Sequence, residues 1–91
     1  MAKHRKYTTA KNLIAAGYIK SFREIFDTLP KSVLARDLGM NNIRFSRLMN
    51  NVDHFSLEEL FRIADHLEVD DRIIFDLVYQ QYVEDKKSKK N

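Results

Sequence analysis

The sequence predicts an all-α fold of five to six helices, with a short extra helix at the N-terminal end and a long one at the C-terminal end. Two capping boxes, each a serine followed three residues later by a glutamate, mark helix starts at Ser21 and Ser56. Between them, apolar residues recur at the spacing of one helix face on both sides of Gly39, which suits the left-handed turn that ends a helix. These start and stop signals predict short helices packed into one domain.

The first two helices are expected before Pro30. A short helix runs from Thr8 or Thr9 to Ala16, and a second opens at the Ser21 capping box. The second helix has an apolar face that we expect to be buried, made of Phe22, Ile25, Phe26 and Leu29.

Residues 31–50 are expected to form two short helices joined by a turn at Gly39, which is the arrangement of a helix-turn-helix. Pro30 fits the start of the first of these helices, because a first-turn residue needs no backbone N–H. Asn41 caps the second helix, residues 42–49. The faces expected to meet in the core are Leu34, Ala35 and Leu38 on the first helix, and Phe45, Leu48 and Met49 on the second.

The chain after Ser56 predicts two more helices. The first carries one stripe that we expect to be core, made of Leu57, Leu60, Phe61, Ala64 and Leu67, with Ile63 at its border. The last helix begins at Asp70 or Asp71 and runs to about residues 82–84, with Ile73, Ile74, Leu77 and Val78 on one side. Its other side has a second apolar stripe, Phe75, Tyr79, Tyr82 and Val83. A helix that packs on one neighbour has one apolar side, so this stripe indicates either self-association or packing against the extra N-terminal helix.

Charge is strongly segregated along the 91 residues, although the net charge is only +3. Residues 1–20 hold five cations and no acid, residues 51–85 hold ten acids and two cations, and residues 86–91 hold four lysines. We therefore expect a basic flexible arm over residues 1–8, one helical domain over 9–84 and a basic disordered tail over 85–91. The arm either lies along DNA or only improves solubility. Cations gathered in one part of the chain favour a nucleic-acid partner.

Several classes of function find no support in the sequence. His4, His54 and His66 lack the spacing of metal ligands, and the chain has no cysteine. With only two glycines the chain lacks a phosphate-binding glycine loop, and Ser46 has no base near it in sequence. We expect neither an enzyme nor a metal, cofactor or small-molecule site. Because no segment approaches about 20 apolar residues, we expect no membrane span and a cytoplasmic location.

The outward face of the 42–49 helix has an unusual composition. On a helical wheel with Phe45 turned inward, that face carries Ile43, Arg47 and Asn50, with Arg44 at its edge. Two cations, an amide and an exposed β-branched residue indicate a surface that binds something. The alternative is an ordinary helical hairpin with a charged outer face.

The segment resembles the helix-turn-helix of the phage-repressor and Cro-like family, that is, the lambda-repressor-like or xenobiotic-response-element type. The resemblance lies in Leu34-Ala35, Leu38-Gly39-Met40, Phe45, Leu48 and Asn50. It continues through Phe55-Ser56-Leu57-Glu58-Glu59-Leu60 and Ile63-Ala64-Asp65-His66-Leu67-Glu68-Val69, and spans about residues 22–78. The sequence departs from the family at Lys31, where the family usually has glutamine.

The resemblance implies a small, sequence-specific DNA-binding transcriptional regulator that reads the major groove of double-stranded DNA with the 42–49 helix. By correspondence with the family, the base-reading residues are Asn42, Ile43, Arg44 and Arg47. The residues expected to hold phosphates are Lys31, Ser46, Asn50 and Asn51. A homodimer is expected, with the second stripe of the last helix as the place to look for its interface.

Two other functions compete with this interpretation. A protein-interaction module, such as an antitoxin or adaptor subunit, would keep the fold without specific DNA reading. The acidic stretch 51–85 and the double-sided last helix favour it, since together they would suit a basic partner. An RNA-binding module is less favoured, because the sequence lacks exposed aromatic residues placed to stack on bases.

Overall fold

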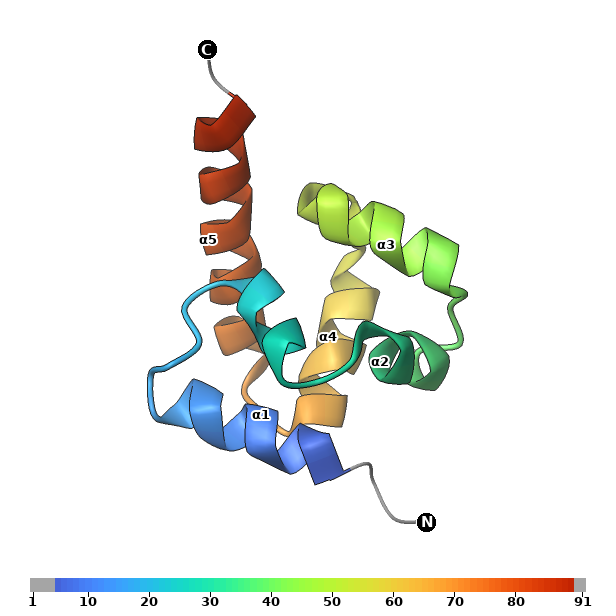
Figure 1. Cartoon of the computed structure of the whole chain (residues 1–91), viewed down its shortest axis with the longest axis vertical. Coiled ribbons are helices and arrows are strands. Elements are labelled where there is room, and N and C mark those ends of the chain that lie inside the picture. The colour runs from blue at the N-terminus through green and yellow to red at the C-terminus, as the bar shows by residue number, and fades with distance from the viewer. Residues whose placement is uncertain (1–4, 90–91) are drawn as a thin grey trace.

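The all-α prediction is confirmed. The structure is a computed structural model that describes residues 5–89, and within that range it consists of five α-helices and two short 3-10 helices, with no strand (Figure 1). A single hydrophobic core runs through it, to which every helix contributes. No described helix is both long and apolar enough to cross a membrane.

Helix α1 spans Arg5–Ala15 and begins earlier than expected. Residues 5–8, predicted as part of the flexible arm, are helical, and residues 1–4 of that arm lie outside the described residues. The reason is Tyr7, which is 1% exposed and forms one buried face with Ala10 and Ile14. An aromatic core residue inside a basic run therefore starts the helix one turn earlier than the polar composition suggested.

The second predicted helix is a 3-10 helix, η1, over Phe22–Asp27. Its capping box forms as expected, and the carboxylate of Glu24 accepts the backbone N–H groups of Lys20 at 2.6 Å and Ser21 at 3.3 Å. Pro30 disfavours the helical conformation for the residue before it, so the segment has room for only two tight turns. Phe22, Ile25 and Leu29 are buried as predicted.

Helices α2, Lys31–Asp37, and α3, Asn42–Asn50, pack against each other across the turn at Gly39. Asn41 caps α3 as expected, since its side chain accepts the Arg44 N–H at 2.7 Å. Gly39 has a φ of 74°, and a Cβ added there would meet nothing within 4 Å. The turn therefore needs glycine for its left-handed conformation and not for lack of space. The predicted inward faces are all buried, with Ala35 at 0% exposure.

After the short 3-10 helix η2, Val52–His54, helix α4 spans Leu57–Leu67 and shows a different buried face from the one predicted. Leu60, Ala64 and Leu67 are buried, but Leu57 is 67% and Phe61 44% exposed, whereas Ile63 is fully buried. The cause is α1, which packs against α4 and stacks the ring of Tyr7 on His66 with a centroid distance of 6.0 Å. This extra helix draws the Ile63 side of α4 into the core and leaves the Leu57 side open.

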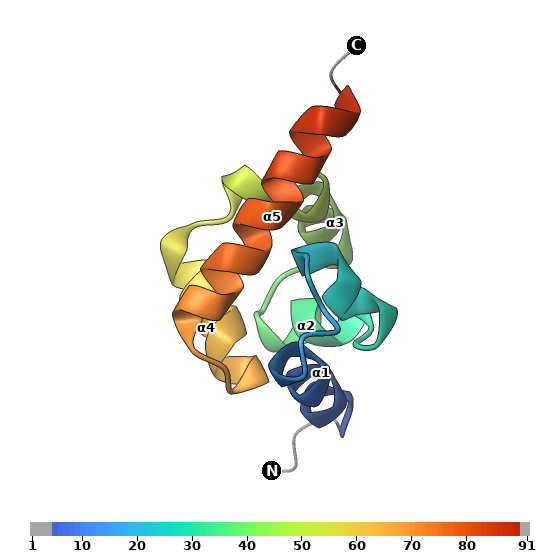
Figure 2. The ribbon, with the colours of Figure 1, turned by 90° about the vertical axis from the view of Figure 1, so that its left-hand side faces the viewer.

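Helix α5, Asp71–Lys89, is longer than expected and runs antiparallel to α4 (Figures 1 and 2). Its 19 residues correspond to about 28 Å of helix. Residues 85–89, predicted as disordered tail, belong to this helix, and residues 90–91 lie outside the described residues. In both views its last turns extend past α3. Ile74, Leu77 and Val78 are buried as predicted, but Ile73 is 39% exposed.

Candidate nucleic-acid interface

The four residues predicted to read bases lie together on the outer face of α3. Asn42, Ile43, Arg44 and Arg47 are all exposed, while Phe45 on the opposite face is 1% exposed. Asn41 fixes the start of the helix and Phe45 fixes its rotation, so the local sequence determines which side chains face outward. The outer face of α3 is an open edge of the molecule.

Ile43 is the most unusual member of this face. It is 69% exposed, among the largest exposures of any large apolar side chain in the described chain. Single exposed apolar residues are common on protein surfaces. Ile43, however, lies on the same helix face as two arginines and an amide, so an apolar contact and polar contacts are available to one ligand.

The two arginines of this face have different surroundings. The Arg44 guanidinium lies 3.0 Å from a carboxylate oxygen of Glu59, a residue whose side chain is 15% exposed. For Arg47, no side-chain ion pair is found within the part of the chain that the structure describes, and its carbonyl accepts the Asn51 side-chain N–H at 3.3 Å. Of the two arginines predicted to read bases, Arg44 is therefore held by an ion pair, whereas Arg47 is available to contact a ligand.

Glu59 remains charged in this setting. Partial burial disfavours its carboxylate, but hydrogen bonds from Ser56 and from Arg44, together with the positive charge of Arg44, outweigh that cost and hold the pKa of Glu59 below its usual value. The negative charge of Glu59 is thus compensated by an adjacent cation.

The residues predicted to hold phosphates are all exposed. Lys31 lies exposed in the first turn of α2, and Ser46 and Asn50 are exposed on α3. Asn51 is also exposed, but its side-chain amide donates to the carbonyl of Arg47 and so closes the end of α3.

The C-terminal end of α3 is fixed by a polar network that the sequence reasoning missed. Arg23 lies on η1, and its guanidinium donates to the carbonyl of Met49 at 3.3 Å and contacts Asp85 at 3.5 Å. Gln81 is 2% exposed; its amide oxygen accepts the backbone N–H of Arg23 at 2.9 Å, and its amide nitrogen donates to Asp85 at 2.9 Å. Gln81 follows Ile74 by seven residues, or two helical turns, so it lies on the buried face of α5, and this spacing could have predicted that its side chain is buried.

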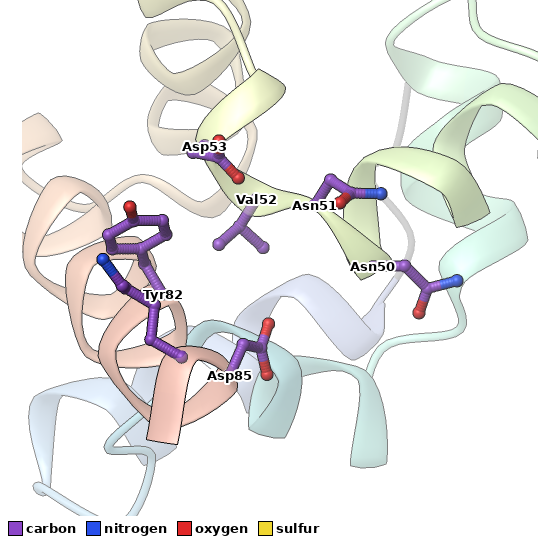
Figure 3. A pocket seen from close by; sticks show the side chains of 7 residues that line it. Asn50, Asn51, Val52, Asp53, Tyr82 and Asp85 are labelled. Atoms are coloured by element: carbon purple, nitrogen blue, oxygen red, sulfur yellow. The ribbon is translucent and has the colours of Figure 1, made fainter. Parts of the chain in front are cut away.

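Figure 3 shows this end of the site from close by. A hollow of about 50 Å³ lies between the end of α3 and α5 and is lined by Asn50, Asn51, Tyr82 and Asp85; in this view the side chains of Asn50 and Asn51 point away from α5. The Lys86 ammonium lies 5.4 Å from the centroid of the Tyr82 ring. The hollow is too small for an organic ligand. Its lining residues form part of the contact between the end of α3 and α5.

The second apolar stripe of α5 is only partly covered. The ring of Phe75 packs edge-on against Phe61 with a centroid distance of 5.4 Å, whereas Tyr79 is 61% exposed. Leu57 precedes Phe61 by one turn and Tyr79 follows Phe75 by one turn, so in antiparallel helices both lie toward the same end. We call Leu57, Phe61, Phe75 and Tyr79 the α4–α5 patch. Helix α1 packs elsewhere on α4 and leaves this patch open, and Tyr82 and Val83 are half-buried beside it.

Within residues 5–89, no group of three or more histidine, cysteine, aspartate or glutamate side chains is placed to hold a metal ion. Comparison of the chain with models of protein families, with curated proteins and with solved structures finds no match.

Proposed function

We propose that the protein is a small cytoplasmic DNA-binding regulator of transcription with a lambda-repressor-like helix-turn-helix, and that α3 enters the major groove. The observation that carries the proposal is the outer face of α3, where Ile43 and Arg47 are exposed side by side with amide and hydroxyl side chains. The turn at Gly39 and the cap at Asn41 hold this face outward.

The chemistry of this face matches that of the major groove. Each base pair presents its own pattern of donors, acceptors and methyl groups there. Arg47 is suited to bidentate pairing with guanine, Asn42 to pairing with adenine, and Ile43 to contact with a thymine methyl group. Each good bidentate pair gives about 1–3 kcal/mol of discrimination between bases. Arg44 belongs to the base-reading set by family resemblance, although Glu59 holds its guanidinium.

Contacts with the phosphates would fix the register of α3 on the duplex. Lys31, Ser46 and Asn50 are exposed and are suited to this role, whereas Asn51 would have to give up its bond to the carbonyl of Arg47. Lys31 acts as a point charge, and binding should weaken steeply with salt because phosphate contacts release counterions.

A homodimer fits this function. One module of this size covers only about 600–1,000 Å² of DNA, so tight binding needs two copies on half-sites about one helical turn apart, or a multiple of it. The α4–α5 patch offers four adjacent apolar side chains to a second copy, and the half-buried Tyr82 and Val83 extend it along α5.

Selection of bound sequences from random DNA tests the reading surface. We expect Arg47→Met to change the preferred base at one position of the site, and Ile43→Ala to relax a preference for thymine. Arg62→Met removes the same charge from an exposed position on α4 and should leave the selected sequence unchanged. If neither Arg47→Met nor Ile43→Ala alters the selected sequence, the assignment of the reading residues is wrong.

The mass of the protein in solution tests the dimer. We expect Tyr79→Glu to convert dimers to monomers by placing a charge in the α4–α5 patch. Tyr18→Glu makes the same change at a residue that is 76% exposed elsewhere, and it should leave the mass unchanged. Equal masses for the two variants would exclude this patch as the interface.

The α4–α5 patch also supports the second candidate, a protein-interaction module such as an antitoxin or adaptor subunit. Leu57 and Tyr79 are both more than half exposed within an acidic part of the chain, which suits a partner with apolar and basic side chains. Measuring DNA affinity at about 50 and about 200 mM salt separates the two functions, because only a phosphate-binding protein loses affinity steeply over that range.

A further inference from the structure

The ion pair between Arg44 and Glu59 joins the first turn of α3 to the first turn of α4. Both carboxylate oxygens of Glu59 are engaged: one accepts the backbone N–H of Ser56 at 2.9 Å, and the other lies 3.0 Å from the Arg44 guanidinium. A reciprocal hydrogen bond runs the other way: the hydroxyl of Ser56 accepts the backbone N–H of Glu59 at 3.1 Å. Glu59 is therefore a fixed part of the capping box of α4 and differs from a mobile surface acid.

Arg44 is held at both of its ends. Its backbone N–H donates to the side chain of Asn41 at 2.7 Å, and its guanidinium pairs with Glu59. To reach a base, the guanidinium would have to leave a half-buried carboxylate without its cation, at the edge where a phosphate backbone would approach. Removing one partner of such a pair is costly, because the charge that remains is poorly solvated.

Arg47 has neither restraint. It lies almost one turn further along the outer face of α3, and its side chain has no ion pair within the described residues. Its planar fork of donors can therefore turn toward a ligand without breaking a contact.

We propose that Glu59 is a positioning residue: it holds Arg44 as a brace between α3 and α4, away from the DNA, and so leaves base reading to Asn42, Ile43 and Arg47. This inference rests on the proposed DNA-binding function.

The test compares Glu59→Gln with Glu58→Gln, using the purified 91-residue chain and the duplex selected by the wild type. Both variants remove one negative charge, and glutamine at position 59 still supplies an oxygen for the capping box. Glu58 is its exposed neighbour. In Glu59→Gln the released Arg44 gains a phosphate contact, so the slope of log affinity against log salt should steepen by about 0.9, whereas Glu58→Gln should keep the wild-type slope.

Substitution of Arg44 completes the experiment. Arg44→Met alone should leave the selected sequence unchanged, and in the Glu59→Gln background it should return the salt slope to the wild-type value. Thermal unfolding of each variant confirms that it is folded before binding is compared.

Equal slopes for Glu59→Gln and Glu58→Gln overturn the inference while the DNA-binding function stands. A changed base preference in Arg44→Met does the same, because it would make Arg44 a reader. Absence of DNA binding by the wild type overturns both the proposed function and this inference.

Discussion

The phenol of Tyr7 donates a hydrogen bond of 2.8 Å to the carboxylate of Asp37, thirty residues further along the chain. This bond joins α1 to the last residue of α2, just before the turn at Gly39. Burial and the neighbouring carboxylate both raise the pKa of Tyr7, so the phenol keeps its proton and remains a donor. The N-terminal helix is thereby an integral support of the α2–α3 unit.

Replacing Tyr7 with phenylalanine should weaken this support. The ring remains in the core, but the Asp37 carboxylate loses a donor, and hydrogen bonds to charged groups contribute about 1.5–3 kcal/mol. Because the Asp37 side chain is 27% exposed, water can replace the lost donor. We therefore expect the free energy of unfolding to fall by about 1–2 kcal/mol, near the lower end of that range. Denaturant titration measures this loss. Tyr18→Phe, at a site 76% exposed, serves as the matched control and should change stability by less than about 0.5 kcal/mol.

Acid should destabilise the protein partly through Asp37. Partial burial disfavours its charged form, but hydrogen bonds from Tyr7 and Arg36 and the charge of Arg36 outweigh this and lower the pKa of Asp37 below its ordinary value of 3.8. A carboxyl group whose pKa is lower in the folded state stabilises the fold above its unfolded pKa, about 3.9, and loses that contribution as pH falls through its folded pKa.

We therefore expect the stability difference between the wild type and Asp37→Asn to be constant above about pH 5 and to narrow below about pH 4. Thermal unfolding across this range measures it. A difference that stayed constant down to about pH 2 would contradict a lowered pKa for Asp37.

Gly39→Ala should destabilise the turn between α2 and α3 by about 1–2 kcal/mol, because a residue with a Cβ is strained at a left-handed φ. Space is not the obstacle, since an added Cβ would meet nothing within 4 Å. Gly39→Asn should cost less, because asparagine tolerates this conformation better. Chemical denaturation of the two variants provides the measurement, and equal costs would argue against backbone strain as the cause.

Much of the α2–α3 unit could be predicted because its signals are local. Gly39 and Asn41 determine the backbone only within one or two turns of their own positions. The apolar residues of the buried face of α3 all lie within eight residues of one another. The two capping boxes, at Ser21 and Ser56, could also be predicted from local sequence, and both form. Because Phe45 faces the core, the helical period determines which side chains of α3 are exposed.

What the sequence did not reveal depends on contacts between distant segments. Tyr7 stands in a basic run and becomes a core residue only because α4 supplies a surface for it. That same contact reverses the expected roles of Ile63 and Leu57 on α4. The pairing of Arg44 with Glu59 was hidden for a similar reason, because neither residue is near the other in sequence.

Gln81 allows a test of such a distant contact. Gln81→Leu would leave the backbone N–H of Arg23 without its acceptor inside the protein, and an unsatisfied buried polar group costs about 1–3 kcal/mol. Gln80→Leu makes the same change at the exposed neighbouring position and should alter stability by less than about 0.5 kcal/mol. Urea denaturation of both variants gives the comparison. If the two lose the same stability, the buried network around Gln81 contributes nothing measurable.

The same network has a consequence for the order of folding. The bond between Arg23 and Gln81 spans 58 residues and the contact between Arg23 and Asp85 spans 62, whereas α2 and α3 meet across a single short turn. Closing a long loop costs more chain entropy than closing a short one. We therefore expect α2 and α3 to associate before the last helix docks against Arg23.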